Sequence, residues 1–158
     1  MSKKVLQTLR KMVLLERKIG LLYSYFQDIF TEDKAFWQQL TKEETEHATL
    51  IETHIEYIND FRDKFKILLE SSEDNVEEII NKITVIINDL GKHVKTREDA
   101  LLLALQMEQS AGELHFQNTA DFQDYESEIP IPIQIFQSLA QSDKDHAIKI
   151  SKYLESIR

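Results

Sequence analysis

Hydrophobic residues recur every three or four positions through most of the chain, which is the spacing of an amphipathic helix. Long apolar stripes of this kind cover residues 3–30, 32–69, 96–121 and 132–157, and a shorter one covers 76–90. With 3 Gly and 2 Pro, the sequence contains few residues that would interrupt a helix. The pattern therefore predicts an all-α protein of four long helices, with a long crossover that contains the short extra helix.

Residues at the ends of these stripes carry helix start and stop signals. Thr31, followed by two acids, is a predicted N-cap, and Thr96 with Asp99 forms a predicted capping box. Gly91 is placed to end the short helix, and Pro132 can serve as the first residue of the last one.

Polar residues interrupt each long stripe at positions where the period requires a core side chain. They are Glu16 in the first helix, Glu44 and His47 in the second, Glu108 in the third, and Asp143 and His146 in the fourth. A buried carboxylate is costly unless it is paired, protonated or bound to a metal. In the second and fourth helices the acid and the histidine are three residues apart, so they lie on one helix face.

Helix lengths predict that the six residues meet. Glu16 and Glu44 both lie about 20 Å from the turn that joins their helices, at ~1.5 Å per residue. In the second hairpin, Glu108 and Asp143 likewise lie at similar distances from the connection between their helices. Gly20 and Gly112 each follow the first glutamate of their hairpin by one helical turn. The two hairpins thus look like pseudo-repeats.

One acid from each of two helices and an acid-x-x-His pair from each of two others is the ligand pattern of a carboxylate-bridged dimetal site. Oxygen-rich ligation with one imidazole per metal suits iron or manganese better than zinc or copper. The sequence therefore predicts two such ions, with Glu16, Glu44, His47, Glu108, Asp143 and His146 as ligands. The alternative is that the helix phases are wrong by one residue and that these are ordinary surface side chains.

These residues, together with the run Tyr23-Ser24-Tyr25-Phe26, resemble the rubrerythrin group of ferritin-like proteins over nearly the whole chain. The resemblance implies a ferritin-like four-helix bundle and a non-haem di-iron centre that reacts with peroxide or oxygen. In that family the residues matching Glu16, Glu44, Glu108, His47 and His146 are metal ligands, some of them bridging, and a homodimer is usual.

Three departures from the family pattern stand out. Asp143 replaces the usual glutamate, and Ala111 replaces a further glutamate of the third helix. The sequence has no Cys, so it lacks the rubredoxin-like module that supplies electrons in rubrerythrin, and turnover would need an external electron donor protein. The absence of Cys also excludes iron–sulfur clusters, disulfides and cysteine-ligated zinc.

Composition limits the remaining function classes. A chain of 158 residues suits a single domain spanning 1–158. The net charge of −9 argues against nucleic acid or an anionic membrane as partner. No signal peptide and no apolar run of ~20 residues is evident, which favours a cytoplasmic protein.

Two tyrosines and two histidines have open roles. The candidate catalytic residue is Tyr23. It and Tyr25 would either hydrogen-bond ligands or act as radical or proton donors. The alternative is that both are core tyrosines with paired hydroxyls. His54 and His115 lie one heptad after His47 and Glu108, where they would form a secondary metal or proton-relay site, or would be edge or hydrogen-bonded core residues.

Three functions remain open on the sequence. The first is a di-iron or di-manganese oxidoreductase that reduces peroxide or oxygen. The second is iron oxidation and storage in a cage. Two features argue against it: no fifth helix is predicted after the fourth, and Thr45 stands where the haem-binding Met of bacterioferritin is expected. For the second reason no haem is predicted. The third is a non-catalytic metal-binding or helical scaffold protein with a degenerate site.

Overall fold

The computed structural model describes residues 3–60, 69–119 and 129–158, and these residues form helices and no strands. The predicted all-α class is therefore confirmed. None of the helices in the described ranges combines the length and apolar character needed to cross a membrane.

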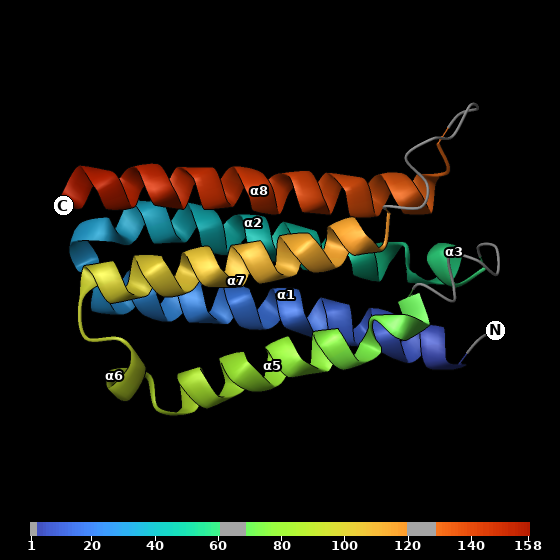
Figure 1. The fold of residues 1–158 in the computed structure, drawn as a ribbon, viewed down its shortest axis with the longest axis horizontal. Coiled ribbons are helices and arrows are strands. Elements are labelled where there is room, and N and C mark those ends of the chain that lie inside the picture. Colours follow the sequence, from blue (N-terminus) through green and yellow to red (C-terminus); the bar gives the residue numbers. More distant parts are fainter. Residues whose placement is uncertain (1–2, 61–68, 120–128) are drawn as a thin grey trace.

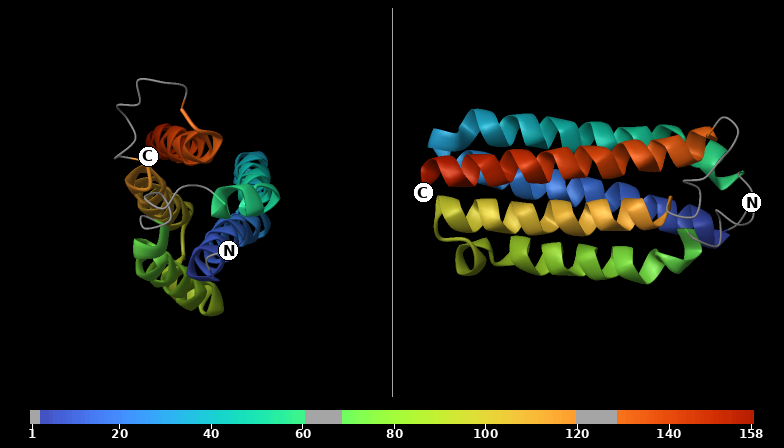
Figure 2. Two further views of the ribbon diagram at one scale, coloured as in Figure 1. Left: turned by 90° about the vertical axis from the view of Figure 1, so that its right-hand side faces the viewer. Right: turned by 45° about the horizontal axis from the view of Figure 1, so that its top comes forward.

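Four long helices lie side by side (Figures 1 and 2). They are α1 (Lys3–Ile29), α2 (Lys34–Thr53), α7 (Arg97–Gln117) and α8 (Ile131–Ile157). α1 packs antiparallel against α2, and α7 packs antiparallel against α8. The apolar stripes face inward, and fully buried Tyr23, Trp37 and Phe136 are among the largest side chains of the core. The stripe of α1, read from the sequence as a core face, is buried from Val5 to Phe26.

The crossover contains α5 (Glu73–Asn88) and the short α6 (Leu90–His93). α5 packs along the outside of α1 and α7 and buries Val76, Ile80, Ile83 and Ile86. Its predicted end at Gly91 is wrong. The backbone leaves the helical region at Asp89 (φ −142°, ψ 57°), and Gly91 lies inside α6.

The predicted continuous helix over 32–69 is also wrong, because it is interrupted at His54 before α3 (Ile55–Asn59). The Nδ1–H of His54 donates to the carbonyl of Leu50 (2.9 Å), the acceptor that a regular helix would offer to the backbone N–H of His54. That N–H bonds instead to Ile51 (3.2 Å). Residues 61–68 of the prediction lie outside the described residues.

The helix starts agree with the sequence only in part. The capping box of Thr96 and Asp99 is present. Thr31 does not cap α2, because residues Thr31–Asp33 form the short 3₁₀ helix η1 and α2 begins after it. α8 begins at Ile131, which places Pro132 second rather than first. α7 ends at Gln117, short of the expected residue 121, and residues 120–128 lie outside the described residues.

Candidate metal centre

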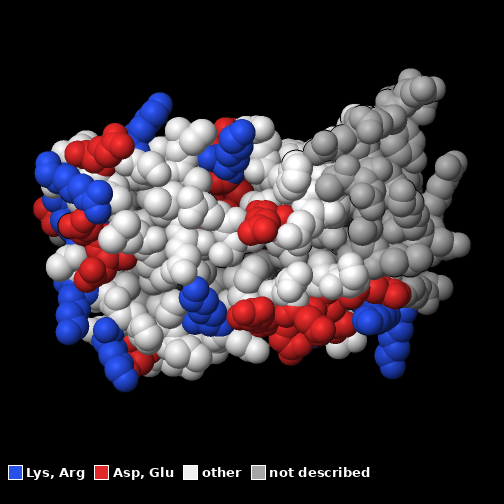
Figure 3. Space-filling model, viewed as in Figure 1, with Lys and Arg blue, Asp and Glu red and all other residues white. Residues whose placement is uncertain are grey.

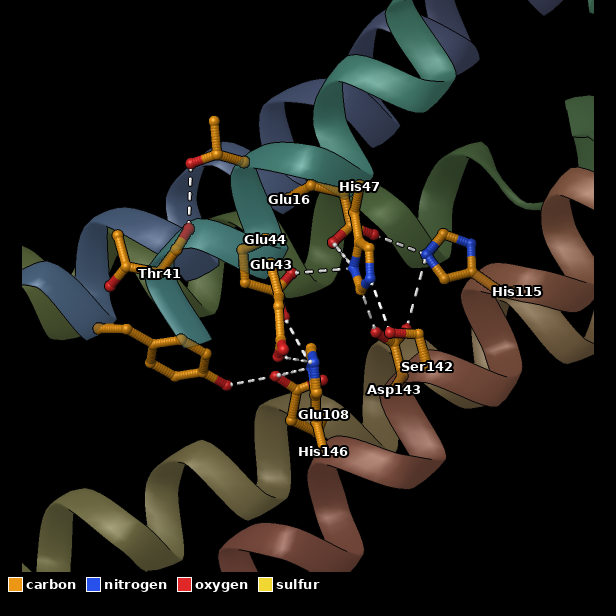
Figure 4. A network of polar contacts seen from close by, with 12 residues as sticks. Glu16, Thr41, Glu43, Glu44, His47, Glu108, His115, Ser142, Asp143 and His146 are labelled. Atoms are coloured by element: carbon orange, nitrogen blue, oxygen red, sulfur yellow. Dashed lines mark hydrogen bonds and ion pairs between the residues drawn. The ribbon is translucent and has the colours of Figure 1, made fainter. Parts of the chain in front are cut away.

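The six polar residues that interrupt the apolar stripes meet between the four long helices (Figure 4). Their exposed fractions are 0% for Glu16 and Glu44, 1% for Glu108 and Asp143, 8% for His47 and 5% for His146. The reading of these residues as surface side chains is therefore wrong. The predicted meeting of the six is confirmed, and their role as ligands remains a prediction.

The cluster divides into two overlapping groups. Glu16, Glu44, His47 and Asp143 form one, and Glu44, Glu108, Asp143 and His146 form the other; in each, one ligand atom per residue lies within 4.8 Å of the others. Glu44 and Asp143 belong to both groups, so these two carboxylates are placed to bridge two ions. Glu16 and Glu108 each belong to one group.

The atoms that face the middle of the cluster lack hydrogen-bond partners. They include Oε2 of Glu16, both carboxylate oxygens of Glu44 and Asp143, Oε2 of Glu108, and Nδ1 of His47 and His146. Leaving so many buried polar atoms unpaired would be strongly destabilising unless a ligand satisfies them. Four carboxylates balance the charge of two divalent ions, and the donor set therefore fits a pair of such ions.

Electrostatics support the same conclusion. Burial, followed by the charges of Glu108 and Glu16, raises the pKa of Glu44 well above its usual value. Burial and the same two neighbours raise the pKa of Asp143. For Glu16 burial acts in the same direction, but hydrogen bonds from His115 and His47 outweigh it and lower the pKa. Without a cation, the centre therefore holds more negative charge than its surroundings can stabilise.

Each histidine is oriented by a residue on the opposite hairpin. Nε2 of His146 donates to Oε2 of Glu43 (2.6 Å), and Nε2 of His47 lies 2.8 Å from Oγ of Ser142. The other ring nitrogen, Nδ1, therefore faces the carboxylates, at 3.4 Å from Glu44 for His47 and 3.2 Å for His146. An imidazole held through one nitrogen presents the other as a ligand in a fixed orientation.

The sequence analysis missed Glu43 and Ser142 as functional residues, although a signal was present. Each directly precedes the acid of its acid-x-x-His motif, so the two occupy matching positions in the pseudo-repeats.

Two further side chains bind the outer carboxylates. Tyr23 donates from Oη to Oε1 of Glu108 (2.7 Å), and Nε2 of His115 lies 2.6 Å from Oε1 of Glu16. Tyr23 is therefore a core tyrosine with a paired hydroxyl, and it would also bond a ligand if Glu108 binds metal, whereas Tyr25 is 38% exposed at the surface. His115 is a hydrogen-bonded residue of the cluster itself, and His54 is hydrogen-bonded within its own helix, away from it.

The outer edges of the two imidazoles face solvent through an opening of about 360 Å³, which Glu43, Glu46, Asp145 and Lys149 also line. Glu46 is exposed, and a carboxylate oxygen of it lies 4.0 Å from Nζ of Lys42. The two imidazoles stack at 5.5 Å between ring centres. The cluster is therefore closest to solvent on the side of α2 and α8, where the two imidazoles separate it from the opening.

Gly20 and Gly112 lie against the two acids that both ligand groups share. A Cβ at Gly20 would lie 3.4 Å from Cβ of Glu44, and one at Gly112 would lie 3.2 Å from Cβ of Asp143. The glycines therefore allow Glu44 and Asp143 of the neighbouring helices to lie close to α1 and α7. Comparison with family models, curated proteins and solved structures finds no match for this chain.

Proposed function

We propose that this protein is a ferritin-like dimetal carboxylate protein of the rubrerythrin type, which reduces peroxide or oxygen. The observation that carries the proposal is the pair of overlapping ligand groups that share Glu44 and Asp143. Two antiparallel hairpins related by a pseudo-repeat, joined by a crossover that contains α5, support the ferritin-like bundle.

In this proposal one ion is held by Glu16 and His47 and the other by Glu108 and His146, with Glu44 and Asp143 between them. When bound, two iron or manganese ions would supply one-electron changes between divalent and trivalent states. The protein contributes position and protons. Burial and the nearby Glu108 and Glu44 raise the pKa of Tyr23, which keeps its hydroxyl protonated and donating to Glu108.

Tyr23 is accordingly a positioning residue that acts through Glu108, and its catalytic role as a proton donor stays a prediction. A short path from the hydroxyl through Oε1 of Glu108 would allow a proton to move toward the centre. Tyr23 is fully buried beside Trp37, at 5.5 Å between ring centres, so bulk water does not compete for this bond.

The proposal includes partners. Because these 158 residues contain no Cys with which to form a rubredoxin-like module, the proposal includes an external electron donor protein. A cytoplasmic homodimer is the expected form, and exposed Leu14, Leu21 and Tyr25 on α1 offer an apolar surface for a second copy. Sedimentation equilibrium tests this, since a monomer at all concentrations would exclude the dimer.

Metal analysis tests the ligand assignment. The full chain is loaded with ferrous iron without oxygen, freed of unbound iron, and then exposed to peroxide. About two ions per chain and a new ferric absorption band are expected. Glu44→Ala and His47→Ala should lose most of the metal. Glu46→Ala should retain it, because Glu46 lies between these two residues in the sequence but is exposed. Equal metal content in all three variants would reject the assignment.

A second candidate is a metal-binding protein that does not turn over. Asp143 favours it, because its side chain is one methylene shorter than the glutamate of the family pattern, and Ala111 supplies no further carboxylate. Two bound ions that peroxide fails to oxidise would support this candidate. Iron storage in a cage requires a large multi-subunit particle, which the same sedimentation measurement would detect.

A further inference from the structure

Four aromatic rings form a row that connects the candidate centre with one end of the bundle. The inner end of this aromatic row is Tyr23, whose hydroxyl donates to Oε1 of Glu108 (2.7 Å). The ring centre of Tyr23 lies 5.5 Å from that of Trp37, and Trp37 lies 5.2 Å from Phe36. Phe36 stacks on Tyr153 of α8, with 4.2 Å between the ring centres and 9° between the planes. All three separations are typical of aromatic side chains in contact.

The outer end of the aromatic row lies close to solvent. Tyr23 and Trp37 are fully buried, whereas Tyr153 is half-buried near the end of α8. The hydroxyl of Tyr153 donates to Oδ1 of Asp33 (2.6 Å) in η1. Figure 3 shows that charged side chains of both signs gather at this end of the molecule, in contrast to the mainly uncharged surface over α7 and α8. A water-soluble reductant would therefore reach the row at Tyr153 and not at its buried members.

The pseudo-repeat shows that the aromatic row is specific to one side of the centre. Counted from the matching acids and histidines, the equivalents of Tyr23, Trp37, Phe36 and Tyr153 are, in that order, His115, Phe136, Ile135 and His54. None of these four side chains gives up an electron as readily as tyrosine or tryptophan does. The oxidisable rings therefore lead to the side of Glu108, and the equivalent positions on the side of Glu16 hold no tyrosine or tryptophan.

The polar atoms of the row suit its members to the transfer of single electrons. A phenol becomes a strong acid when it loses an electron, so a tyrosine is readily oxidised where a base within hydrogen-bond reach takes its proton. Asp33 is such a base for Tyr153, and hydrogen bonds from Arg97 (2.6 and 2.8 Å) hold its carboxylate in place. Nε1 of Trp37 has no hydrogen-bond partner in the described part of the chain. An oxidised Trp37 therefore cannot release its proton, and its charge passes on to a neighbouring tyrosine.

We propose that the aromatic row passes single electrons from Tyr153 at the surface to Tyr23 at the centre, so that oxidising equivalents from peroxide are discharged at the surface and not in the core. Peroxide accepts two electrons and two protons and leaves as two waters. Each electron that Tyr153 gives up leaves a neutral tyrosyl radical, because the proton moves to Oδ1 of Asp33. A small water-soluble reductant then returns one electron, and Asp33 returns the proton. Transfer along the row is a property of these side chains alone, whereas its use against peroxide rests on the proposed function.

Laser flash photolysis of the metal-free full chain tests the row directly. A pulse that only tryptophan absorbs photoionises Trp37, the single Trp of the sequence, and the tyrosyl absorption band should grow as the band of the Trp37 radical decays. Ascorbate should quench the tyrosyl radical quickly in the wild type. In Tyr153→Phe the radical stays on buried Tyr23, so quenching should be severalfold slower. Tyr57→Phe, which changes an exposed tyrosine outside the row, is the control and should quench like the wild type.

A second comparison isolates the ring between Trp37 and Tyr153. In a Tyr23→Phe background, where Tyr153 is the remaining tyrosine of the row, Phe36→Leu removes the stacked ring and should slow growth of the tyrosyl band severalfold. Phe30→Leu is the matched control, because Phe30 is also half-buried but contacts Phe26 and does not lie between two oxidisable rings. Circular dichroism and Tm verify that each variant is folded.

Equal quenching rates in the wild type and Tyr153→Phe would overturn the proposal. So would slower quenching in Tyr25→Phe, because Tyr25 and not Tyr153 would then be the exit. In the iron-loaded protein, peroxide should produce a tyrosyl radical signal in electron paramagnetic resonance spectra, which ascorbate removes. Protein that binds iron and reduces peroxide without this signal would overturn the use of the row. Failure to bind iron, with transfer from Trp37 to Tyr153 intact, would reject the proposed function and leave the row standing.

Discussion

Tyr23 and His115 occupy matching positions in the two hairpins, each seven residues after the buried glutamate of its own helix, and each bonds the glutamate of the other helix. Tyr23 on α1 donates to Glu108 on α7 (2.7 Å), and His115 on α7 lies 2.6 Å from Glu16 on α1. The two bonds cross between α1 and α7. They fix one oxygen of each outer carboxylate and leave the other directed at the centre.

Tyr23→Phe should weaken metal binding at the Glu108 side about ten- to a hundredfold, as expected when a ligand loses its orienting hydrogen bond. The ring remains packed, so the fold should persist. Calorimetric titration with Mn²⁺ would show one of two binding steps weakened. Tyr25→Phe removes an equally polar group from an exposed site and should leave both steps unchanged. Two unchanged steps in Tyr23→Phe would show that the bond to Glu108 does not orient a ligand.

The two histidines are oriented unequally, which predicts two unequal ions. His146 donates to a carboxylate, Glu43, whereas His47 meets the neutral hydroxyl of Ser142. A charged acceptor makes the stronger hydrogen bond and the more basic imidazole. Glu43→Gln should therefore reduce the affinity of one ion more than Ser142→Ala reduces that of the other.

Visible spectra of the Co²⁺-loaded protein would measure this difference, since each ion contributes its own bands. Glu46→Gln is the control for Glu43→Gln, because it removes a carboxylate from the same solvent opening without touching an imidazole. Equal losses of ion affinity in Glu43→Gln and Ser142→Ala would contradict the prediction that the two ions are bound unequally.

The helical period was enough to predict the candidate centre. Glu16, Glu44 and Glu108 replace apolar residues within otherwise regular stripes, and the cost of burying a carboxylate made each replacement informative. Rise per residue then placed them at one level. The helical period and the rise per residue depend only on local geometry and on the positions of two hairpin turns. An error of a few residues at a helix end therefore does not change the predicted meeting of these residues.

What the sequence did not predict depends on contacts between hairpins. The bonds of Glu43 and Ser142 connect helices that are far apart in the chain, so their matching positions before the two acids could mark these residues but not identify their partners. The interruption at His54 was missed for a different reason. An imidazole can compete for the carbonyl four residues earlier, but most histidines in helices do not, so period and propensity alone predicted a continuous helix.

Metal binding and neutralisation of the cluster should each make the protein more stable than the metal-free wild type. A ligand at a hundred times its Kd adds about 2.7 kcal/mol, which corresponds to a rise in Tm of roughly 5–10 °C for a chain of this size. Glu44→Gln/Asp143→Asn replaces two buried acids, whose ionised forms are disfavoured by burial and by Glu108 and Glu16, with neutral amides. Without metal this variant should melt above the wild type, and Mn²⁺ should no longer raise its Tm.

Differential scanning fluorimetry with Mn²⁺, and with Mg²⁺ as the oxygen-preferring comparison ion, measures both effects. A variant that melts below the wild type in the absence of metal would mean that the carboxylates stabilise the fold without a cation, which conflicts with their unpaired oxygens.

At the end of the bundle where η1 connects α1 to α2, the side chain of Asp33 links η1 to α7 and α8. Its side chain is 1% exposed and accepts hydrogen bonds from Arg97 (2.6 and 2.8 Å) and Tyr153 (2.6 Å). Burial alone would raise the pKa of Asp33, but the bonds from Arg97 and Tyr153 outweigh it and lower the pKa below its usual value. The ionised form is therefore stabilised by folding.

A carboxyl group whose pKa is lowered on folding stabilises the native state above its unfolded pKa of about 3.9, and the contribution disappears as pH falls through the folded value. Asp33→Asn should thus cost about 2 kcal/mol at pH 7, the scale of hydrogen bonds to a charged group, and the difference from wild type should narrow below about pH 3.9. Urea unfolding at a series of pH values measures it, with exposed Asp28→Asn as control. A difference that stays constant down to pH 2 would show that packing of the side chain, and not its charge, stabilises this end of the molecule.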